Sequence, residues 1–274
     1  MRKIFDAHIH CSELKDDYLI KFANANHLKY TLEELLGLMD EYDVYGGLLL
    51  SPPLTDGTPA PNQRIIDLCE RSKGRLFPIL TAEPSTKSVI ECVALAKKHA
   101  GFVKGFKIRL GYVPAFPDDD VFSSLYDYAE SKDLPVMFHT GDTATNDGSL
   151  KHAHPLGLDP VANKRPNLKI IICHFGNPWI TDTAELIYKH ENVYADISGM
   201  FVRGAKYSPA YLESLGRKLS EAIYYAGNAD KVIFGTDYPV ETYEDAVSLI
   251  SKIKINTEDV ERIVSKNARW VFSL

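Results

Sequence analysis

The sequence predicts an α/β fold, a (β/α)₈ barrel that forms a single domain over residues 1–274. Short apolar runs rich in β-branched residues alternate eight times with helix-like segments, and no change of composition marks a linker. Eight such units in about 250 residues match the size of this barrel. The runs are continuously apolar rather than alternating, which is typical of parallel strands buried on both faces.

The first predicted helix, TLEELLGLMDEY (31–42), carries Leu32, Leu35, Leu36 and Met39 at helical spacing. Similar amphipathic patterns predict helices at 87–100 and 210–226. An open doubly wound sheet is the alternative fold, but it usually has a glycine-rich phosphate turn after its first strand, where this chain has HIHCSEL (8–14). The predicted strands are IFDAHI (4–9), VYGGLLLS (44–51), LFPILTAE (76–83), FVKGFKIRL (102–110), LPVMFHTG (134–141), LKIIICHFG (168–176), NVYADIS (192–198) and KVIFGTD (231–237).

Composition limits the partners that we expect. A net charge of −6 with mixed signs argues against nucleic acid or an anionic membrane as a partner. The sequence has no apolar run long enough for a signal peptide or a membrane span, which favours a cytoplasmic location. The four cysteines have no CxxC spacing, so we expect reduced, buried thiols rather than disulfides or a thiolate zinc site.

Polar or charged residues lie at the carboxyl ends of the predicted strands. These ends meet at one mouth of a barrel, where catalytic residues of this fold gather. Burying such groups together is costly, so their coincidence predicts a functional site. The residues are His8, His10, Ser51, Glu83, Lys107, Arg109, His139, His174, Asp196, Ser198 and Asp237.

His8 and His10 are two positions apart on one strand, so their side chains point to the same face and can share a metal ion. On its own this motif is more typical of two hydrogen-bonded strand-end histidines than of a metal site. His139, His174 and Asp237 occupy the corresponding positions on other strands. Together they make a nitrogen and oxygen ligand set for a divalent ion, by default zinc, with manganese, iron or nickel also suited.

This constellation resembles the amidohydrolase superfamily of metal-dependent hydrolases. The stretches NQRIIDLCERSKGRLFPILTAEP (62–84), GFKI (105–108), HPLGLDPVANKRPNLKIIICHFG (154–176) and GTDYP (235–239) are similar to its amidohydrolase-related branch (amidohydrolase family 2), which includes aminocarboxymuconate-semialdehyde decarboxylase and 2-pyrone-4,6-dicarboxylate lactonase. The resemblance implies that His8, His10, His139 and Asp237 are metal ligands. It implies that His174 binds a second ion or acts as a catalytic residue beside the metal.

Lys107 departs from the decarboxylase-like members of this branch, which resemble one-metal sites and lack a lysine there. In two-metal amidohydrolases the corresponding lysine is carboxylated and bridges two ions. We expect such a bridge and two ions, because a free cation among four histidines and two metals would be repelled. The alternative is a free ammonium that pairs with Asp237 or with a substrate carboxylate.

Two residues are expected to contact the substrate. Arg109 suits a bidentate grip on a carboxylate or phosphate, although a salt bridge at the rim explains it equally well. By the family likeness His154 faces the site from the long loop TGDTATNDGSLKHAHP (140–155). The loop SPPLTDGTPAPN (51–62) is a further candidate for a wall of the substrate pocket.

The expected function is hydrolysis of an amide, lactone or ester bond in a small molecule, one of anionic character if Arg109 binds it. One or two ions would lower the pKa of a bound water, whose hydroxide attacks the substrate. Asp237 would relay the proton, and His174 would stabilise the oxyanion or bind the second ion. The alternatives are phosphoester hydrolysis at a multinuclear site, one-metal non-oxidative decarboxylation, and a catalytically silent barrel, which the complete ligand set disfavours.

Tyr224 and Tyr225 are adjacent on one predicted helix. They are consistent with a homodimer interface and equally with packing inside the chain.

Overall fold

The computed structural model describes residues 3–14, 17–52, 61–201, 208–227 and 229–274. Most of the candidate wall at 51–62 lies at 53–60, outside the described residues. Among the described residues, every helix is too short or too polar to span a membrane.

The described chain contains eight parallel strands paired in sequence order, which confirms the predicted barrel. The segment after the last strand closes the ring against the first: Ile9 pairs with Tyr238, and the Asp237 N–H donates to the His8 carbonyl at 2.8 Å. The strands are β1 (Ile4–His10), β2 (Val44–Leu50), β3 (Leu76–Thr81), β4 (Gly105–Ile108), β5 (Val136–Phe138), β6 (Ile170–Ile172), β7 (Val193–Asp196) and β8 (Val232–Ile233).

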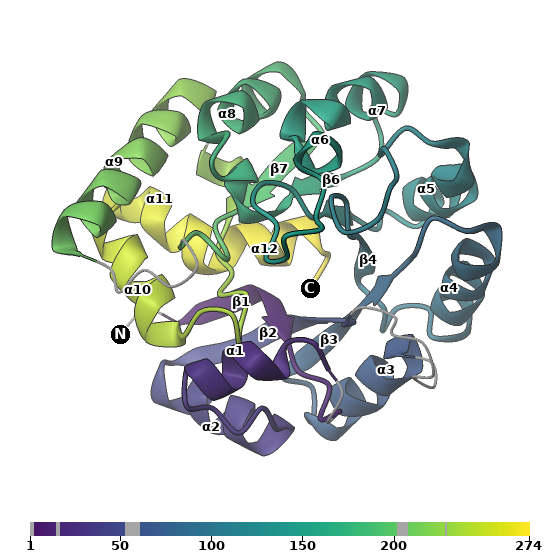
Figure 1. Cartoon of the computed structure of the whole chain (residues 1–274), viewed down its shortest axis with the longest axis horizontal. Coiled ribbons are helices and arrows are strands. Elements are labelled where there is room, and N and C mark those ends of the chain that lie inside the picture. Colours follow the sequence, from purple (N-terminus) through teal and green to yellow (C-terminus); the bar gives the residue numbers. More distant parts are fainter. Residues whose placement is uncertain (1–2, 15–16, 53–60, 202–207, 228) are drawn as a thin grey trace.

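Helices surround the strands in the order of the chain (Figure 1). The three predicted amphipathic helices are present as α2, α4 and α9, each within two residues of its expected ends. The helices are α1 (Ile20–Ala25), α2 (Leu32–Glu41), α3 (Pro61–Arg71), α4 (Thr86–Lys98), α5 (Ser123–Ser131), α6 (Leu150–Ala153), α7 (Asp159–Lys164), α8 (Ile180–Lys189), α9 (Pro209–Ala226), α10 (Tyr243–Lys252), α11 (Thr257–Glu261) and α12 (Asn267–Val271).

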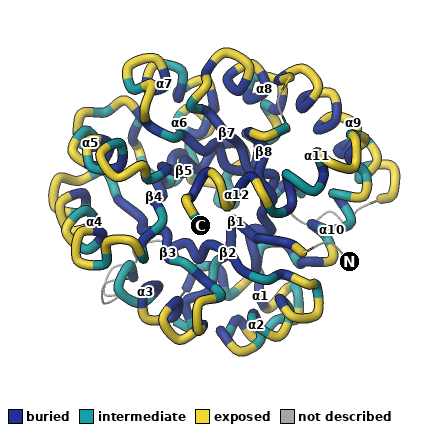
Figure 2. The backbone as a smooth tube through the Cα atoms, turned by 180° about the vertical axis from the view of Figure 1, so that it is seen from behind, coloured by how far each residue is buried: buried dark blue, intermediate teal, exposed yellow. Residues whose placement is uncertain are grey.

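The buried side chains form two apolar layers. One lies between strands and helices and includes Phe106, Phe138 and Ile172. The other fills the barrel itself and joins strand residues such as Met137 to Phe272, which follows α12. In Figure 2, α12 and the C-terminus lie over the centre of the barrel as seen from behind. The apolar filling and α12 therefore close one end of the barrel and leave the other end for a site.

Several strands end earlier than predicted. The run 168–176 keeps only Ile170–Ile172 in the sheet, and the run 231–237 keeps only Val232–Ile233. Beyond these ends the backbone leaves the extended conformation, because His174 has φ 59° and Asp237 has φ 63°. His174 and Asp237 thus lie on turns that follow the strands, whereas His8, His10 and Lys107 lie in β1 and β4.

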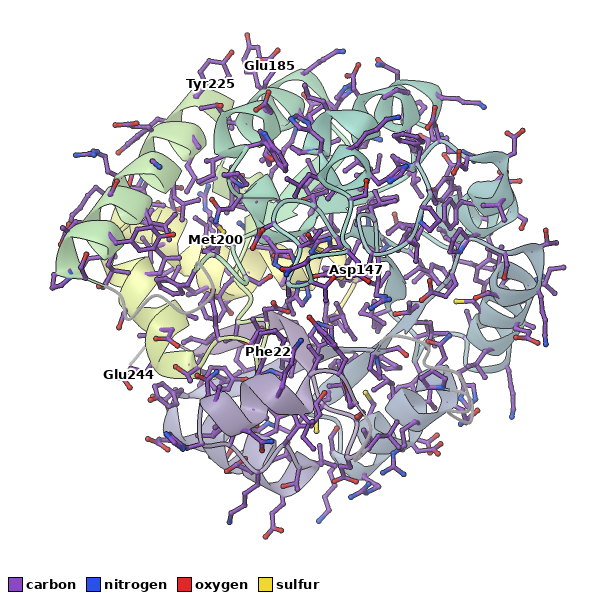
Figure 3. All side chains as sticks on the ribbon, in the orientation of Figure 1. Phe22, Asp147, Glu185, Met200, Tyr225 and Glu244 are labelled. Carbon is purple, nitrogen blue, oxygen red and sulfur yellow. The ribbon has the colours of Figure 1, made fainter. Side chains whose placement is uncertain are left out.

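Tyr224 and Tyr225 are 67% and 59% exposed on α9, so packing inside the chain does not account for them. The Tyr225 hydroxyl donates to Glu185 on α8, and both side chains project outward from the molecule (Figure 3). The homodimer stays a prediction.

Candidate active site

An irregularity in β1 aims His8 into the mouth of the barrel. Phe5 and Ala7 belong to the apolar filling of the barrel, and strict alternation would turn His8 outward. The register between β1 and β2 shifts between Asp6 and Ile9. This bulge lets the consecutive residues Ala7 and His8 both face inward.

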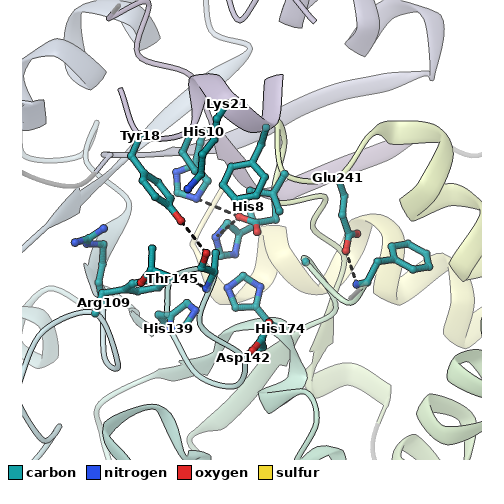
Figure 4. A pocket seen from close by; sticks show the side chains of 18 of the residues that line it. His8, His10, Tyr18, Lys21, Arg109, His139, Asp142, Thr145, His174 and Glu241 are labelled. Carbon is teal, nitrogen blue, oxygen red and sulfur yellow. Dashed lines mark hydrogen bonds and ion pairs between the residues drawn. The ribbon is translucent and has the colours of Figure 1, made fainter. Parts of the chain in front are cut away.

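Four histidines meet at this mouth. The ring centroid of His8 lies 5.2 Å from that of His10 and 5.0 Å from that of His174, and His139 lies 5.1 Å from His174. Figure 4 shows the four rings around one cavity. The histidines predicted from strands one, five and six are therefore brought together.

Asp237 completes the group from the turn after β8. Its Oδ1 lies 3.2 Å from His10 Nε2 and 3.4 Å from His8 Nε2. Close approach of the chain segments depends on Gly235, where an added Cβ would lie 2.7 Å from the Cβ of His8. Gly199 serves similarly, because an added Cβ there would lie 2.6 Å from His174 Nδ1.

Asp196, at the end of β7, and Ser198, just after it, hold His8 and His174 in place through hydrogen bonds. His8 Nδ1 donates to Asp196 Oδ2 at 3.0 Å, and the backbone N–H of His174 donates to Asp196 Oδ1 at 2.9 Å. The Ser198 hydroxyl donates to Asp196, and its carbonyl accepts from His174 Nδ1 at 3.0 Å. The strand-end pattern located both residues, but these contacts join three separate strands, so the sequence carried no signal for their role.

The residues fit a divalent cation. Because His8 Nδ1 donates to Asp196, the neutral imidazole carries no proton on Nε2. Burial lowers the pKa of His8 to about 3, with a further contribution from the positive charge of Lys107, so the ring is neutral at pH 7. A bare Nε2 lone pair then faces the Asp237 carboxylate, a repulsive contact that a cation between them would make attractive.

The ligand atoms of His8, His10 and Asp237 lie within 4.8 Å of one another, and His139 stands beside this group. His139 Nδ1 donates to the Leu110 carbonyl at 2.7 Å, which leaves its Nε2 free. A second close group combines His8 with His174 and Asp196, but hydrogen bonds around Ser198 already occupy its atoms.

The charge states suit metal binding. Burial lowers the pKa values of His139 and His174, which keeps both rings neutral. Burial alone would raise the pKa of Asp237, but the hydrogen bond with His10 and the neighbouring histidines hold it below its ordinary value. The site therefore offers the neutral rings of His8, His139 and His174 and one ionised carboxylate.

Lys107 lies at the floor of the same cavity, with only 3% of its surface exposed. Its Nζ donates to Cys173 Sγ at 2.8 Å, so the ammonium contacts Cys173 rather than Asp237. The positive charge of Lys107 contributes to the lowered pKa values of His8, His139 and His174. The carboxylated, ion-bridging form of Lys107 stays a prediction.

Arg109 lines the cavity at its rim, where the sequence places it. Its Nε lies 3.6 Å from Glu83 Oε1, and neither atom has a hydrogen-bond partner in the described part of the chain. The guanidinium lies 5.5 Å from the centre of the Tyr112 ring. The rim ion pair is therefore present but too long for a hydrogen bond, which leaves the guanidinium able to bind an anion.

His154 does not join the described lining of this cavity. Its ring packs on Trp179 with centroids 4.4 Å apart, and its Nδ1 accepts from the Leu156 N–H at 3.3 Å as the cap of a short 3₁₀ turn. This placement gives no support to the predicted substrate-binding role of His154. The reason is local, since Pro155 and the 3₁₀ turn that it begins direct the His154 side chain toward Trp179, next to α8.

The cavity has a volume of about 1410 Å³, and Tyr18, Phe22, Tyr112 and Phe201 line it among many polar and charged side chains. Phe22 comes from α1, a helix that the sequence analysis did not predict, and Tyr18 comes from the turn just before it. The 140–155 loop lies across the mouth: the Ala144 carbonyl accepts from the Tyr18 hydroxyl, and its N–H donates to the Tyr112 hydroxyl. Phe22 and Asp147 project toward the centre of the barrel in Figure 3.

The model of the amidohydrolase family matches residues 5–274. The chain belongs to the amidohydrolase family. This amidohydrolase is 23% identical over 238 residues to gamma-resorcylate decarboxylase from a Polaromonas species, an alignment that covers 72% of this chain and 69% of that protein.

Solved structures share the fold of this amidohydrolase. A probable 2-pyrone-4,6-dicarboxylic acid hydrolase from Acinetobacter baumannii has a TM-score of 0.72 at 19% identity, with 99% of this chain and all of that chain covered. A dihydroxybenzoic acid decarboxylase from Polaromonas, solved with manganese and the inhibitor 2-nitroresorcinol, has a TM-score of 0.70 at 17% identity, with 100% and 98% covered.

The comparisons confirm the predicted family and an enzyme of the amidohydrolase superfamily. They do not confirm hydrolysis, because the curated relative is a decarboxylase. Metal binding agrees with the His8, His10 and Asp237 group and with the manganese in one neighbour.

Proposed function

We propose that this amidohydrolase is a divalent-metal-dependent, non-oxidative decarboxylase of a hydroxylated aromatic carboxylic acid. The observation that carries the proposal is the ligand group of His8 Nε2, His10 and Asp237, whose facing atoms lie outside the Ser198 hydrogen-bond network, whereas that network occupies the second close group of the described chain. This arrangement supports the one-metal decarboxylase interpretation over the two-ion hydrolase. The similarity to gamma-resorcylate decarboxylase supports the same choice.

In the proposed reaction the bond between the ring carbon and the carboxylate breaks and carbon dioxide leaves. The bonding electrons stay on the ring carbon, which takes up one proton, so the reaction needs no oxidant or added water. A divalent ion held by His8, His10, His139 and Asp237 would supply positive charge for the oxygens of the substrate.

The protein residues divide the remaining tasks. Asp237 relays the proton to the ring carbon, since it is an acid-base group at the centre of the cavity. His174, whose Nδ1 is held by Ser198, presents Nε2 as an acceptor for a substrate hydroxyl. The rings of Tyr18 and Phe22 suit an aromatic substrate, and Arg109 suits an anionic group at the rim.

The test is an assay of the metal-loaded protein with 2,6-dihydroxybenzoate. We expect release of carbon dioxide and resorcinol, and in D₂O one deuterium at the carbon that lost the carboxylate. Asp237→Asn should lower kcat by about 10²- to 10⁴-fold because a proton relay and a metal ligand are lost together. Protein stripped with a chelator and reloaded with manganese or zinc is the control.

Hydrolysis of a lactone or ester is the second candidate, because Lys107 lies close enough to the histidines to affect their pKa values and could bridge two ions once carboxylated. The same protein is therefore assayed with a pyrone dicarboxylate lactone. Turnover of the lactone without release of carbon dioxide from any hydroxybenzoate would refute the decarboxylase proposal.

A further inference from the structure

Glu241 is a buried acid in the wall of the cavity, outside the group of predicted ligands. It lies between β8 and α10 and is only 2% exposed. In Figure 4 its side chain lies on the opposite side of the histidines from Arg109. The cavity is therefore flanked by a cation on one side and by an acid on the other.

The carboxyl group of Glu241 has very few partners. One oxygen, Oε1, accepts from the backbone N–H of Phe201 at 2.6 Å. Among the described residues, its other oxygen has no hydrogen bond, and no lysine, arginine or histidine lies within ion-pair distance of it. The charged groups that act on Glu241 most strongly are Asp237 and Asp245, which are both acidic.

Such surroundings favour the neutral acid. Burial raises the pKa of Glu241 well above its ordinary value; the Phe201 N–H opposes this, and repulsion from Asp237 and Asp245 adds to it. A divalent ion held by Asp237 would offset the negative charge of that residue. Burial and the charge of Asp245 would still raise the pKa of Glu241.

A neutral carboxyl group is a hydrogen-bond donor. Since Oε1 accepts the Phe201 N–H, the proton belongs on Oε2, and this donor needs an acceptor in the cavity. We propose that Glu241 is a specificity-determining residue whose carboxyl group donates a hydrogen bond to an oxygen of the bound substrate, on the side of the cavity remote from Arg109. An acid in this state can line a cavity for an anionic substrate without repelling it. The choice of a hydroxylated aromatic acid as that substrate rests on the proposed function.

Binding of two probes to the metal-loaded protein tests the contact. 2-Nitroresorcinol and 2-nitrophenol differ by one hydroxyl oxygen, and neither loses carbon dioxide. We expect the parent to prefer 2-nitroresorcinol, Glu241→Gln to keep that preference within about threefold because an amide N–H also donates, and Glu241→Met to reduce it by about tenfold. An equal preference in the parent and both variants would overturn the proposal.

Infrared difference spectroscopy tests the neutral state without any ligand. The carbonyl band of protonated carboxylic acids at pH 7, to which the buried Asp6 also contributes, should lose one component in Glu241→Gln and keep it in Glu244→Gln, which removes an exposed acid of the same segment. A parent spectrum without this component would overturn the proposal. If the band and the preference are as expected but no hydroxybenzoate is decarboxylated, the proposed function fails and the role of Glu241 stands.

Discussion

The imidazole of His8 lies between two carboxylates, Asp196 at Nδ1 and Asp237 at Nε2. Asp196 is fully buried, and despite the opposing effect of burial its hydrogen bond with His8 and the positive charge of Lys107 hold its pKa far below the ordinary value. It therefore stays ionised and fixes the proton of His8 on Nδ1. At the scale of single residues, the availability of His8 Nε2 for a metal ion depends on Asp196, a carboxylate that does not face the cavity.

Asp196→Asn is expected to weaken divalent metal binding by about 10- to 100-fold, because the amide is a poorer acceptor for His8 Nδ1 and cannot also accept every other donor of the network. Competition with a chromophoric chelator measures the effect for manganese and zinc. Asp127→Asn is the matched control, since Asp127 is 67% exposed on α5 and pairs with Arg165. An affinity within twofold of the parent, in a variant with unchanged circular dichroism, would contradict the assigned role.

At the scale of elements, the bulge in β1 and the turn after β8 must fit against each other. The bulge directs His8 inward, close to Gly235. A Cβ added at Gly235 would lie 2.7 Å from the Cβ of His8 and 3.0 Å from the Cβ of Ser198. Packed backbones seldom yield by the amount that such contacts require. A side chain at residue 235 would therefore disturb His8 and Ser198 together.

Gly235→Ala should destabilise the protein by about 1–3 kcal/mol through overpacking and should also weaken metal binding. Gly37→Ala is the control, because its Cβ would meet nothing within 4 Å in α2, and a helical alanine should stabilise by about 0.5–1 kcal/mol. Urea denaturation and chelator competition give the two readouts. If Gly235→Ala were as stable as the parent, the close approach of β1 and β8 would not constrain the site.

At the scale of the whole molecule, stability and chemistry occupy opposite ends of the barrel. The interior layer of Phe5, Ile79 and Met137 continues into α12 and Phe272, whereas the cavity opens beyond the histidines. This division is typical of (β/α)₈ enzymes, whose catalytic ends vary while the filling holds the strands together.

Phe272→Ala is expected to lower the free energy of unfolding by about 3–5 kcal/mol, because it opens a void at the end of the barrel opposite the histidines. Trp270→Ala, which removes a side chain that is 67% exposed, should change stability by about 0.5 kcal/mol or less. The affinity of the folded Phe272→Ala protein for 2-nitroresorcinol should stay close to that of the parent. A large loss of affinity would show that the two ends are coupled.

Much of the fold was predictable because it depends on local patterns. Continuous apolar runs such as Ile170–Ile172 determine buried parallel strands, and spaced leucines as in 31–42 determine helices. The same alternation placed His8, His10, His139, His174 and Asp237 at one mouth, since the carboxyl ends of parallel strands face the same way. The composition of the strand ends thus located the candidate metal group and contributed to the resemblance that predicted the family.

The tertiary structure decided what depends on contacts between distant segments. It set the bulge in β1, the positive φ values of His174 and Asp237, the hydrogen bond of Asp196 with His8, and the burial of Glu241 with no cation beside it among the described residues. It also turned His154 toward Trp179. Local sequence encodes periodicity, but the charge state and orientation of a buried side chain depend on which atoms the other strands bring to it, and those atoms meet only when the barrel closes.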